Sequence, residues 1–237
     1  MKALILDVET TGLDCKKDSI IEVAAIVVDL ESKIIEAERS SLIYAVTNQD
    51  SEKITGITQD MLDGVKNSFA DPFDLIKTYA QRCVCVIAHN AEFDKSFVEQ
   101  SGIILKNSDN QILEWICSYR DITYDVQTIN KKLTTIADTY GIVADGAHRA
   151  LADVTMLAQI LFKLPNSIDQ ITRAIEEKKK PEIKIISLAK FEQKEDVKKA
   201  GFRWNPADKI WWKNVRSAND SELQSIIKSF AFDVRIA

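Results

Sequence analysis

Proline and glycine are scarce in this 237-residue sequence, with four and seven residues respectively. Collagen-like repeats and linker-rich chains need far more of both, so these classes are excluded. No apolar run approaches the roughly 20 residues that a membrane-spanning helix requires. The first apolar run ends at Asp7, short of the roughly 7–15 residues of a secretory signal. We therefore expect a cytoplasmic protein without a membrane partner.

Cysteine and histidine are also rare, with four and two residues. The cysteines show no pair of closely spaced doublets of the kind that binds zinc, and we expect all four to be reduced thiols. The net charge of −5 argues against nucleic-acid binding, because such proteins are usually basic. The charge is uneven, however: residues 182–237 hold eleven Lys/Arg and eight Asp/Glu, and the remainder is strongly acidic. Bound divalent cations would offset such acidity.

Hydrophobic patterns predict an α/β fold, with a mixed sheet flanked by helices and a small α+β domain at the C-terminus. Closely spaced strands come first and favour an antiparallel meander, whereas later strands alternate with helices. The predicted strands cover residues 3–8, 20–28, 41–46, 84–88 and 112–117. The predicted helices cover residues 69–79, 91–100 (capped by Asn90 and ended by Gly102), 133–140 and 149–162.

The chain is predicted to have three parts: a domain of residues 1–165, a helical connector of residues 166–182, and a tryptophan-rich accessory domain of residues 183–237. In the last part we expect a strand (183–188), a helix (194–200) and a hairpin (202–213) with three of the four tryptophans. Trp204, Trp211 and Trp212 lie among basic residues and could stack on single-stranded nucleic acid. The alternatives are a small core that needs large side chains, and a surface for a protein partner.

Two carboxylates mark the first strand. Asp7 and Glu9 are two residues apart, so both point from one face of a strand that is otherwise apolar. Burying two carboxylates side by side is costly unless a cation lies between them. Ligands that are all oxygen favour Mg²⁺ or Mn²⁺ over zinc. The pair therefore predicts a divalent-metal site.

Two further aspartates lie at the edges of apolar helical faces. Asp94 accompanies Phe93 and Phe97, and Asp153 accompanies Val154 and Leu157. A single aspartate is most often a solvated side chain or a helix cap. Four carboxylates in such positions instead favour a site for two metal ions.

The two histidines are expected to have different roles. His148 precedes Asp153 by five residues in a polar stretch, and a neutral imidazole there could deprotonate water near pH 7. A purely structural role for His148 is the alternative. His89 is expected to support its local turn or a phosphate.

Three segments resemble the exonuclease motifs of the DnaQ-like, or DEDDh, superfamily. They are DVETTG at residues 7–12, HNAEFDKSF at 89–97 and HRALADVTML at 148–157. The segments KITGITQDML (53–62) and LTTIADTYGI (133–142) also fit this family, although Thr55 stands where many members have histidine. The resemblance covers residues 1–164. It implies a ribonuclease H-like fold and a 3′→5′ exonuclease that releases 5′ mononucleotides.

The resemblance also implies roles for individual residues. Asp7, Glu9, Asp94 and Asp153 would bind two Mg²⁺ or Mn²⁺ ions, with Glu9 and His148 as the catalytic residues. The implied substrate contacts are Thr10, Thr11, Gly12, Leu13 (a wedge between the last bases), Asn90 and Phe93, although Phe93 fits core packing equally well. The expected partner is a nucleic acid with a 3′ end, single-stranded DNA in preference to RNA. The alternatives are an exoribonuclease and a non-catalytic, polymerase-associated subunit.

Overall fold

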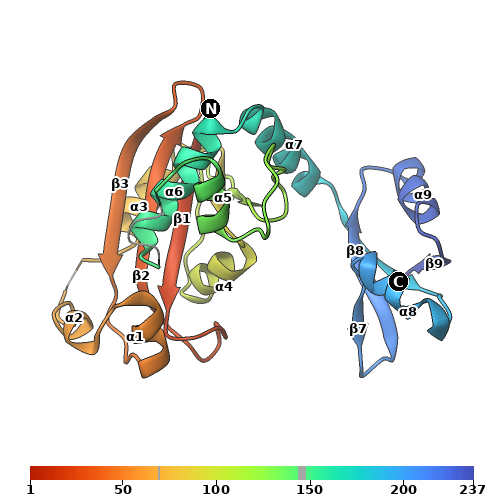
Figure 1. The fold of residues 1–237 in the computed structure, drawn as a ribbon, viewed down its shortest axis with the longest axis horizontal. Helices are drawn as coiled ribbons and strands as arrows, with labels where there is room; N and C mark the ends of the chain where they lie inside the picture. Colours follow the sequence, from red (N-terminus) through yellow and green to blue (C-terminus); the bar gives the residue numbers. More distant parts are fainter. Residues whose placement is uncertain (69, 144–147) are drawn as a thin grey trace. The chain divides into compact units, whose positions relative to one another are not determined.

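The computed structural model describes residues 1–68, 70–143 and 148–237. The chain divides into two compact units, Met1–Ile175 and Glu176–Ala237 (Figure 1). The boundary falls within helix α7 (Ser167–Lys179), which occupies most of the segment predicted as a connector. Among the helices described, none combines the length and the apolar character needed to cross a membrane.

The first unit is built on a five-stranded sheet in the order β3-β2-β1-β4-β5. Strands β1, β2 and β3 form an antiparallel meander, whereas β4 and β5 run parallel to β1. This mixed sheet with flanking helices confirms the predicted fold class. The strands are β1 Lys2–Thr10, β2 Ile20–Asp29, β3 Ile34–Leu42, β4 Cys85–Ala88 and β5 Glu114–Cys117. The helices that precede α7 are α1 Gln49–Thr55, α2 Gln59–Asp63, α3 Asp74–Ala80, α4 Glu92–Gln100, α5 Leu133–Thr139 and α6 Ala150–Lys163.

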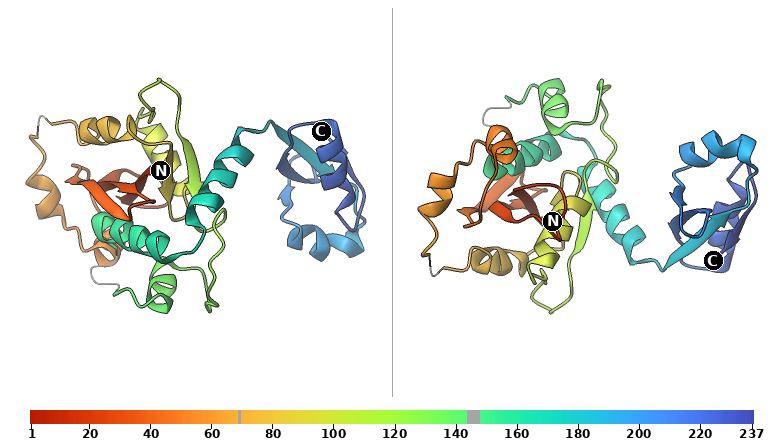
Figure 2. Two further views of the ribbon diagram at one scale, coloured as in Figure 1. Left: turned by 90° about the horizontal axis from the view of Figure 1, so that it is seen from above. Right: turned by 90° about the horizontal axis from the view of Figure 1, so that it is seen from below.

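Both faces of the sheet are covered by helices, as the two views in Figure 2 show. The even-numbered residues of β1, among them Leu4 and Leu6, pack in a core with α3 and α4. The odd-numbered residues Ala3 and Ile5 pack in a second core with α6. Strand β1 is therefore buried on both sides, which explains its nearly continuous apolar sequence.

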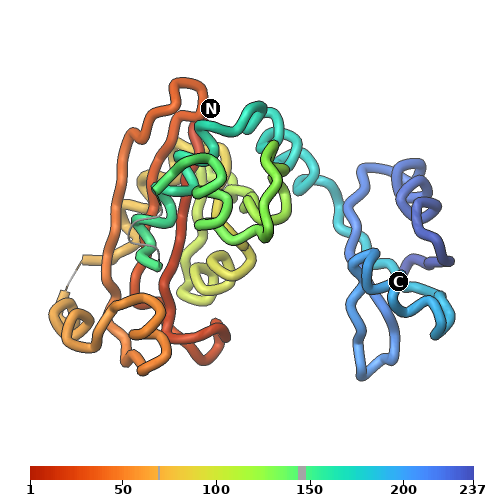
Figure 3. Tube along the Cα trace, viewed as in Figure 1, coloured from red at the N-terminus to blue at the C-terminus, as the bar shows by residue number. Residues whose placement is uncertain are grey.

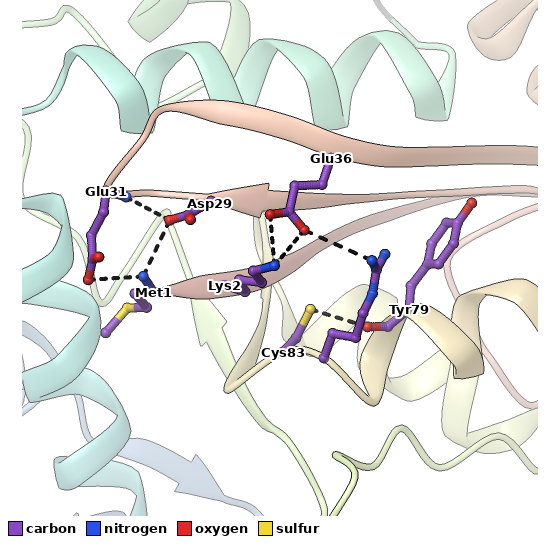
Figure 4. A network of polar contacts seen from close by, with 8 residues as sticks. Met1, Lys2, Asp29, Glu31, Glu36, Tyr79 and Cys83 are labelled. Carbon is purple, nitrogen blue, oxygen red and sulfur yellow. Dashed lines mark hydrogen bonds and ion pairs between the residues drawn. The ribbon is translucent and has the colours of Figure 1, made fainter.

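Salt bridges fix the beginning of β1, at the opposite end of the strand from Asp7 and Glu9 (Figure 4). The Lys2 ammonium lies 2.8 Å from the Glu36 carboxylate on β3. The terminal amino group of Met1 lies 3.0 Å from Glu31 and 3.4 Å from Asp29. Charged side chains thus lie at the end of the sheet where β1 begins, whereas the middle of β1 is apolar.

The third strand was predicted at the wrong place. It spans Ile34–Leu42 and not residues 41–46. Strand β3 lies at the edge of the sheet and exposes every second side chain over its first half, so its sequence is polar. The apolar residues Tyr44 and Val46, which suggested a strand, are 38% and 77% exposed and lie beyond it. A search for apolar residues misses an edge strand of this kind, because many of its side chains face solvent.

The start of α4 also differs from the prediction. Asn90 does not cap this helix, because the residue at the cap position is Ala91, without a side-chain hydrogen bond. Asn90 instead adopts a left-handed backbone conformation with φ of 67°. Gly102, with φ of 77°, does follow the end of the helix as predicted. Helices α1 and α2 were not predicted, and residue 69 of the helix predicted at 69–79 lies outside the described residues.

The second unit has a four-stranded antiparallel sheet in the order β7-β8-β6-β9. Its elements are β6 Glu182–Ser187, the short 3₁₀ helix η1 Phe191–Gln193, α8 Lys194–Lys199, β7 Arg203–Asn205, β8 Ile210–Arg216, α9 Asp220–Lys228 and β9 Val234–Ile236. Its core includes Ile185, Val197, Phe202 and Phe232. The predicted strand, helix and hairpin are confirmed, whereas α9 and β9 had not been predicted.

Candidate active site

Three carboxylates meet where β1 approaches its end. Asp7 and Glu9 point from the odd-numbered face of β1, and α6 packs on that face and brings Asp153 from its first turn. One oxygen from each of the three side chains lies within 4.8 Å of the others. Strand alternation and the packing of α6 are thus sufficient to assemble this cluster.

Asp94 lies beside this cluster from another helix. Its side chain is 2% exposed, and its carboxylate accepts a hydrogen bond of 3.1 Å from the backbone N–H of Val8. Val8 stands between Asp7 and Glu9 on β1, so this bond ties α4 to the strand that carries the other carboxylates. The four residues predicted as metal ligands therefore gather from three elements.

The pKa values show how unfavourable the cluster is without a cation. Burial raises the pKa of Asp7 well above its ordinary value, and the carboxylates of Asp94 and Glu9 raise it further. Burial and then repulsion by Asp153 raise the pKa of Glu9 to about 7. Burial also raises the pKa of Asp94 and Asp153. Hard divalent cations such as Mg²⁺ or Mn²⁺ fit this all-oxygen donor set, because their positive charge would relieve the repulsion.

His148 precedes Arg149, the N-cap residue of α6, and is exposed. Its backbone N–H donates a hydrogen bond to the Asp153 carboxylate. Its φ is 67°, a conformation uncommon for residues other than glycine. Residues 145–147 of the polar stretch predicted around it lie outside the described part of the chain. With Asp7 and Asp153, His148 lines a pocket of about 700 Å³.

Glu22 and Arg149 connect the site to the sheet, and sequence reasoning assigned them no role. Glu22 is 2% exposed and pairs with Glu9 in the register between β1 and β2. Its carboxylate accepts two hydrogen bonds from the Arg149 guanidinium, at 2.8 and 3.0 Å, and one of 3.1 Å from the backbone N–H of Ala150. Arg149 follows His148, so this contact anchors the beginning of α6 and the histidine next to it.

The hydrogen bonds around Glu22 determine its charge. Burial raises its pKa, but the bonds from Arg149 and Ala150 outweigh burial, so the pKa lies below its ordinary value. Glu22 is therefore an ionised, paired carboxylate, unlike its neighbour Glu9. The signal in the sequence was a charged residue in the apolar stretch of residues 20–28, a position that requires a partner.

The opposite wall of the pocket comes from the segment that follows β5, which can be traced in Figure 3. Tyr119, Lys131 and Lys132 line the pocket there, and the Lys131 ammonium lies 5.5 Å from the centre of the Tyr119 ring. Among the described residues that line this pocket, these two are the ones with a lysine or arginine side chain. They were not predicted, since the segment has neither a motif nor a periodic pattern.

His89 holds this wall in place. Its Nε2 lies 2.9 Å from the carbonyl oxygen of Lys131, and its Nδ1 lies 2.8 Å from the Ser118 hydroxyl. A carbonyl oxygen only accepts, so Nε2 carries the proton and Nδ1 accepts from Ser118. Burial lowers the pKa of His89, which favours this neutral form. Both ring nitrogens are thus engaged by residues far along the chain, so His89 supports the pocket wall and not only its local turn as predicted.

The predicted substrate residues after β1 form a tight turn. The Thr10 hydroxyl donates to the carbonyl oxygen of Gly12 at 2.6 Å, and the Thr11 hydroxyl accepts from the Ser19 N–H at 3.0 Å. A Cβ at Gly12 would come within 2.4 Å of the Asp18 carboxylate, so a larger residue there would have to displace the Asp18 side chain. Leu13 is 88% exposed, as a wedge against bases would have to be.

The remaining two predicted contacts differ in their surroundings. Asn90 lines the pocket with Asp7 and His148. Phe93 is partly buried, packs against the core of the even-numbered face and lies 4.9 Å from the Phe97 ring, centre to centre. Core packing therefore accounts for at least part of the role of Phe93, and its contact with a substrate stays a prediction.

Known proteins resemble this chain in sequence and in fold. The DNA polymerase III PolC-type of Latilactobacillus sakei subsp. sakei (strain 23K) is 33% identical over 171 residues, which cover 68% of this chain and 11% of that protein. The chain spans 11% and 12% of the first two curated relatives, also PolC-type polymerases. Two solved structures share its fold at a TM-score of 0.52 each.

One is exonuclease X in complex with 5′ overhanging duplex DNA, with 21% identity over 73% of this chain and 95% of the other. The second is a 3′-exonuclease that recognises the 3′ end of a histone mRNA stem-loop, with 20% identity over 71% of this chain and 64% of the other. The family described as exonuclease matches residues 4–161. Because this match covers well over half of the chain and includes every residue of the acidic cluster, the chain belongs to the DnaQ-like exonuclease family.

Proposed function

We propose that this chain is a metal-dependent 3′→5′ exonuclease that releases 5′ mononucleotides, from single-stranded DNA in preference to RNA. The observation that carries the proposal is the cluster of Asp7, Glu9 and Asp153 in one pocket with His148. Membership in the exonuclease family supports it. The preference for DNA rests on the PolC-type polymerases among its relatives.

The residues divide the chemistry among them. Asp7, Glu9, Asp94 and Asp153 would hold two Mg²⁺ or Mn²⁺ ions, which supply Lewis-acid stabilisation of the phosphodiester and lower the pKa of bound water. His148 accepts the proton of the attacking water at an imidazole nitrogen. Its exposed position before α6 lets it transfer that proton to solvent.

Other residues position the nucleic-acid strand. Lys131 and Lys132 line the same pocket as Asp7 and Asp153. Their positive charge attracts the phosphates of the nucleic acid, which the carboxylates would repel. Leu13 packs against the terminal base, and the turn of Thr10, Thr11 and Gly12 brings backbone groups close to the terminal nucleotide. Asn90 contacts the strand backbone, and Phe93 packs beside the terminal bases.

The test uses 3′-labelled single-stranded DNA, duplex DNA and RNA with Mg²⁺ or with EDTA. Wild type, Asp7→Ala, His148→Ala and the exposed control Asp60→Ala are compared. We expect mononucleotide release that EDTA abolishes, and a loss of about 10²–10⁴-fold on removal of the base His148. Asp7→Ala should lose at least as much, and Asp60→Ala should match wild type.

Cleavage in EDTA, or full activity in Asp7→Ala, would refute a metal-dependent exonuclease. Faster release from RNA than from DNA would instead make the chain an exoribonuclease. Binding of the substrates without any cleavage by wild type would identify a non-catalytic subunit.

A further inference from the structure

The second unit contains a pocket of about 260 Å³ with aromatic walls. One wall is the hairpin of β7 and β8, where Trp204 and Trp211 are cross-strand partners with ring centres 5.4 Å apart. The other wall is the segment after β6, with Lys190, Phe191 and Lys194. The pocket is thus formed by elements of one compact unit.

The two outer aromatic rings are not needed for the core of this unit. Phe202 packs edge-on against Phe230 and Phe232 in that core. Phe191, in contrast, is 78% exposed and Trp204 is 46% exposed. Large apolar side chains that remain exposed around a concave surface, with polar residues at the rim, are typical of binding sites.

The charge around the pocket is positive. The second unit holds 14 Lys/Arg and 10 Asp/Glu, a net charge of +4, whereas the first holds 17 and 26, a net charge of −9. The Lys194 ammonium lies 4.7 Å from the centre of the Phe191 ring. Among the described residues that line the pocket, two are lysines and none is acidic. The nearby Glu195 is paired with Lys198 at 3.0 Å.

The tryptophan on the other face of the hairpin has a different environment. Trp212 pairs in register with Arg203 and Ile186, and the Lys184 ammonium lies 5.0 Å from its ring centre. It does not line the pocket. Adjacent residues on a strand face opposite sides, so Trp211 and Trp212 serve two different surfaces.

We propose that the pocket of Phe191, Trp204 and Trp211 binds an unpaired nucleobase of a single strand, with Lys190 and Lys194 contacting the neighbouring phosphates. Apolar rings beside lysines suit a nucleotide, because its flat base can stack on the rings while its phosphate lies near the ammonium groups. A paired base within a duplex has its faces covered by its neighbours, so the occupant is single-stranded. The inference rests on the proposed function, because it gives the second unit the substrate of the first.

The test measures binding by the full-length protein in EDTA, which prevents hydrolysis in a metal-dependent enzyme. The probes are oligo(dT) and oligo(rU) of about 15 nucleotides, close to the upper site size of single-strand-binding folds. We expect Phe191→Ala and Trp204→Ala each to weaken binding about tenfold, since stacking on an aromatic ring contributes roughly that factor or more. Trp204→Phe keeps a ring and should recover most of the loss.

Trp212→Ala is the matched control, because it removes the same side chain from the opposite face. It should change the affinity by less than about twofold, well below the effect expected for one lost stacking contact. Circular dichroism and thermal unfolding check that each variant is folded. In wild type, oligonucleotide binding should quench tryptophan fluorescence, and Trp204→Ala should lose most of this quenching.

Unchanged affinity in folded Phe191→Ala and Trp204→Ala, or an equal loss in Trp212→Ala, would overturn the inference and leave the pocket to a protein partner. Equal binding of oligo(dT) and oligo(rU) supports stacking that depends on neither the 2′-hydroxyl nor the C5-methyl group, and tighter binding of one supports stacking with an added contact to one of these two groups. Hydrolysis of short substrates with Mg²⁺ is measured on the same variants. It should stay as in wild type, so a failure of this inference is separable from a failure of the proposed function.

Discussion

The two units of this chain carry opposite charge and are built on different sheets, one mixed and one antiparallel. The first gathers carboxylates on a strand that is buried on both faces and has a net charge of −9. The second exposes aromatic rings and lysines on a short hairpin and on the segment after β6, and it has a net charge of +4. Metal ligands need fixed positions that only packed elements provide, whereas stacking on a base tolerates a less rigid surface.

The difference also shows in the energetic cost of each site. Burial raises the pKa of Asp7 and Asp94 well above the ordinary range, so ionisation of these carboxyl groups destabilises the first unit. In the second unit, exposure of Phe191 and Trp204 costs only the stabilisation that their burial would have given. Under the proposed function, a bound cation would offset the cost in the first unit, whereas the second unit needs none.

The largest effect that bears on this contrast is expected at Glu22. Glu22→Gln removes the ionised partner of Arg149 and weakens the anchor of His148. We expect kcat to fall about 10–100-fold with little change in KM, as is usual when a residue that orients a catalytic group is lost. Steady-state kinetics on a short oligonucleotide checks this, with exposed Glu38→Gln as the control in the same sheet.

The pH dependence of stability adds a second readout for Glu22. Its folded pKa is lowered, so its contribution to the free energy of unfolding is present above the ordinary value of 4.5 and is lost as pH falls through the folded pKa. Wild type should therefore be more stable than Glu22→Gln at pH 7, and the gap should narrow below pH 4.5. A gap that is constant with pH would show that Glu22 is not an ionised partner of Arg149.

Removal of the second unit tests whether the two sites act independently. A chain that ends at Pro181 should bind long single strands about tenfold more weakly, the factor expected for one stacked base. Its hydrolysis of di- and trinucleotides should be nearly unchanged, since the carboxylates and His148 all belong to the first unit. Comparable losses on short and long substrates would mean that the second unit organises the catalytic site.

The smallest effect is the stabilisation of the first unit by Mg²⁺. At a concentration about ten times the dissociation constant, Mg²⁺ should raise the free energy of unfolding by about 1.4 kcal/mol and the Tm by about 3–6 °C. The folded pKa of Glu9 is raised from 4.5 to about 7, so its contribution to stability is present below 4.5 and is lost as pH rises towards 7.

Protons and Mg²⁺ compete for the same carboxylates, so the Tm shift should be larger at pH 8 than at pH 6. Thermal unfolding of wild type and Asp7→Ala, with and without Mg²⁺ at each pH, measures this Tm shift. An equal shift in Asp7→Ala would place the bound cation elsewhere on the protein.

Much of the first site could be predicted because it depends on local rules. The alternation of side chains along a strand places Asp7 and Glu9 on one face, and helical spacing places Asp94 beside the apolar stripe of its helix. The strand predicted at residues 41–46 was wrong for a related reason: it relied on apolar residues, whereas an edge strand such as β3 is half solvated. The buried strand β1 was thus predicted correctly, whereas the partly exposed strand β3 was misplaced.

The sequence by itself determined the mixed α/β fold, the family and the carboxylates with His148 as its candidate site. Only the tertiary structure decided that Arg149 contacts Glu22, 127 residues away in the sequence, that Lys131 borders the pocket of Asp7 and His148, and that Phe191 lies in one pocket with Trp204. The physical reason is range. Periodicity and motifs record which face of its own element a side chain occupies, but the partner across a sheet or pocket depends on the packing of elements far apart in the chain.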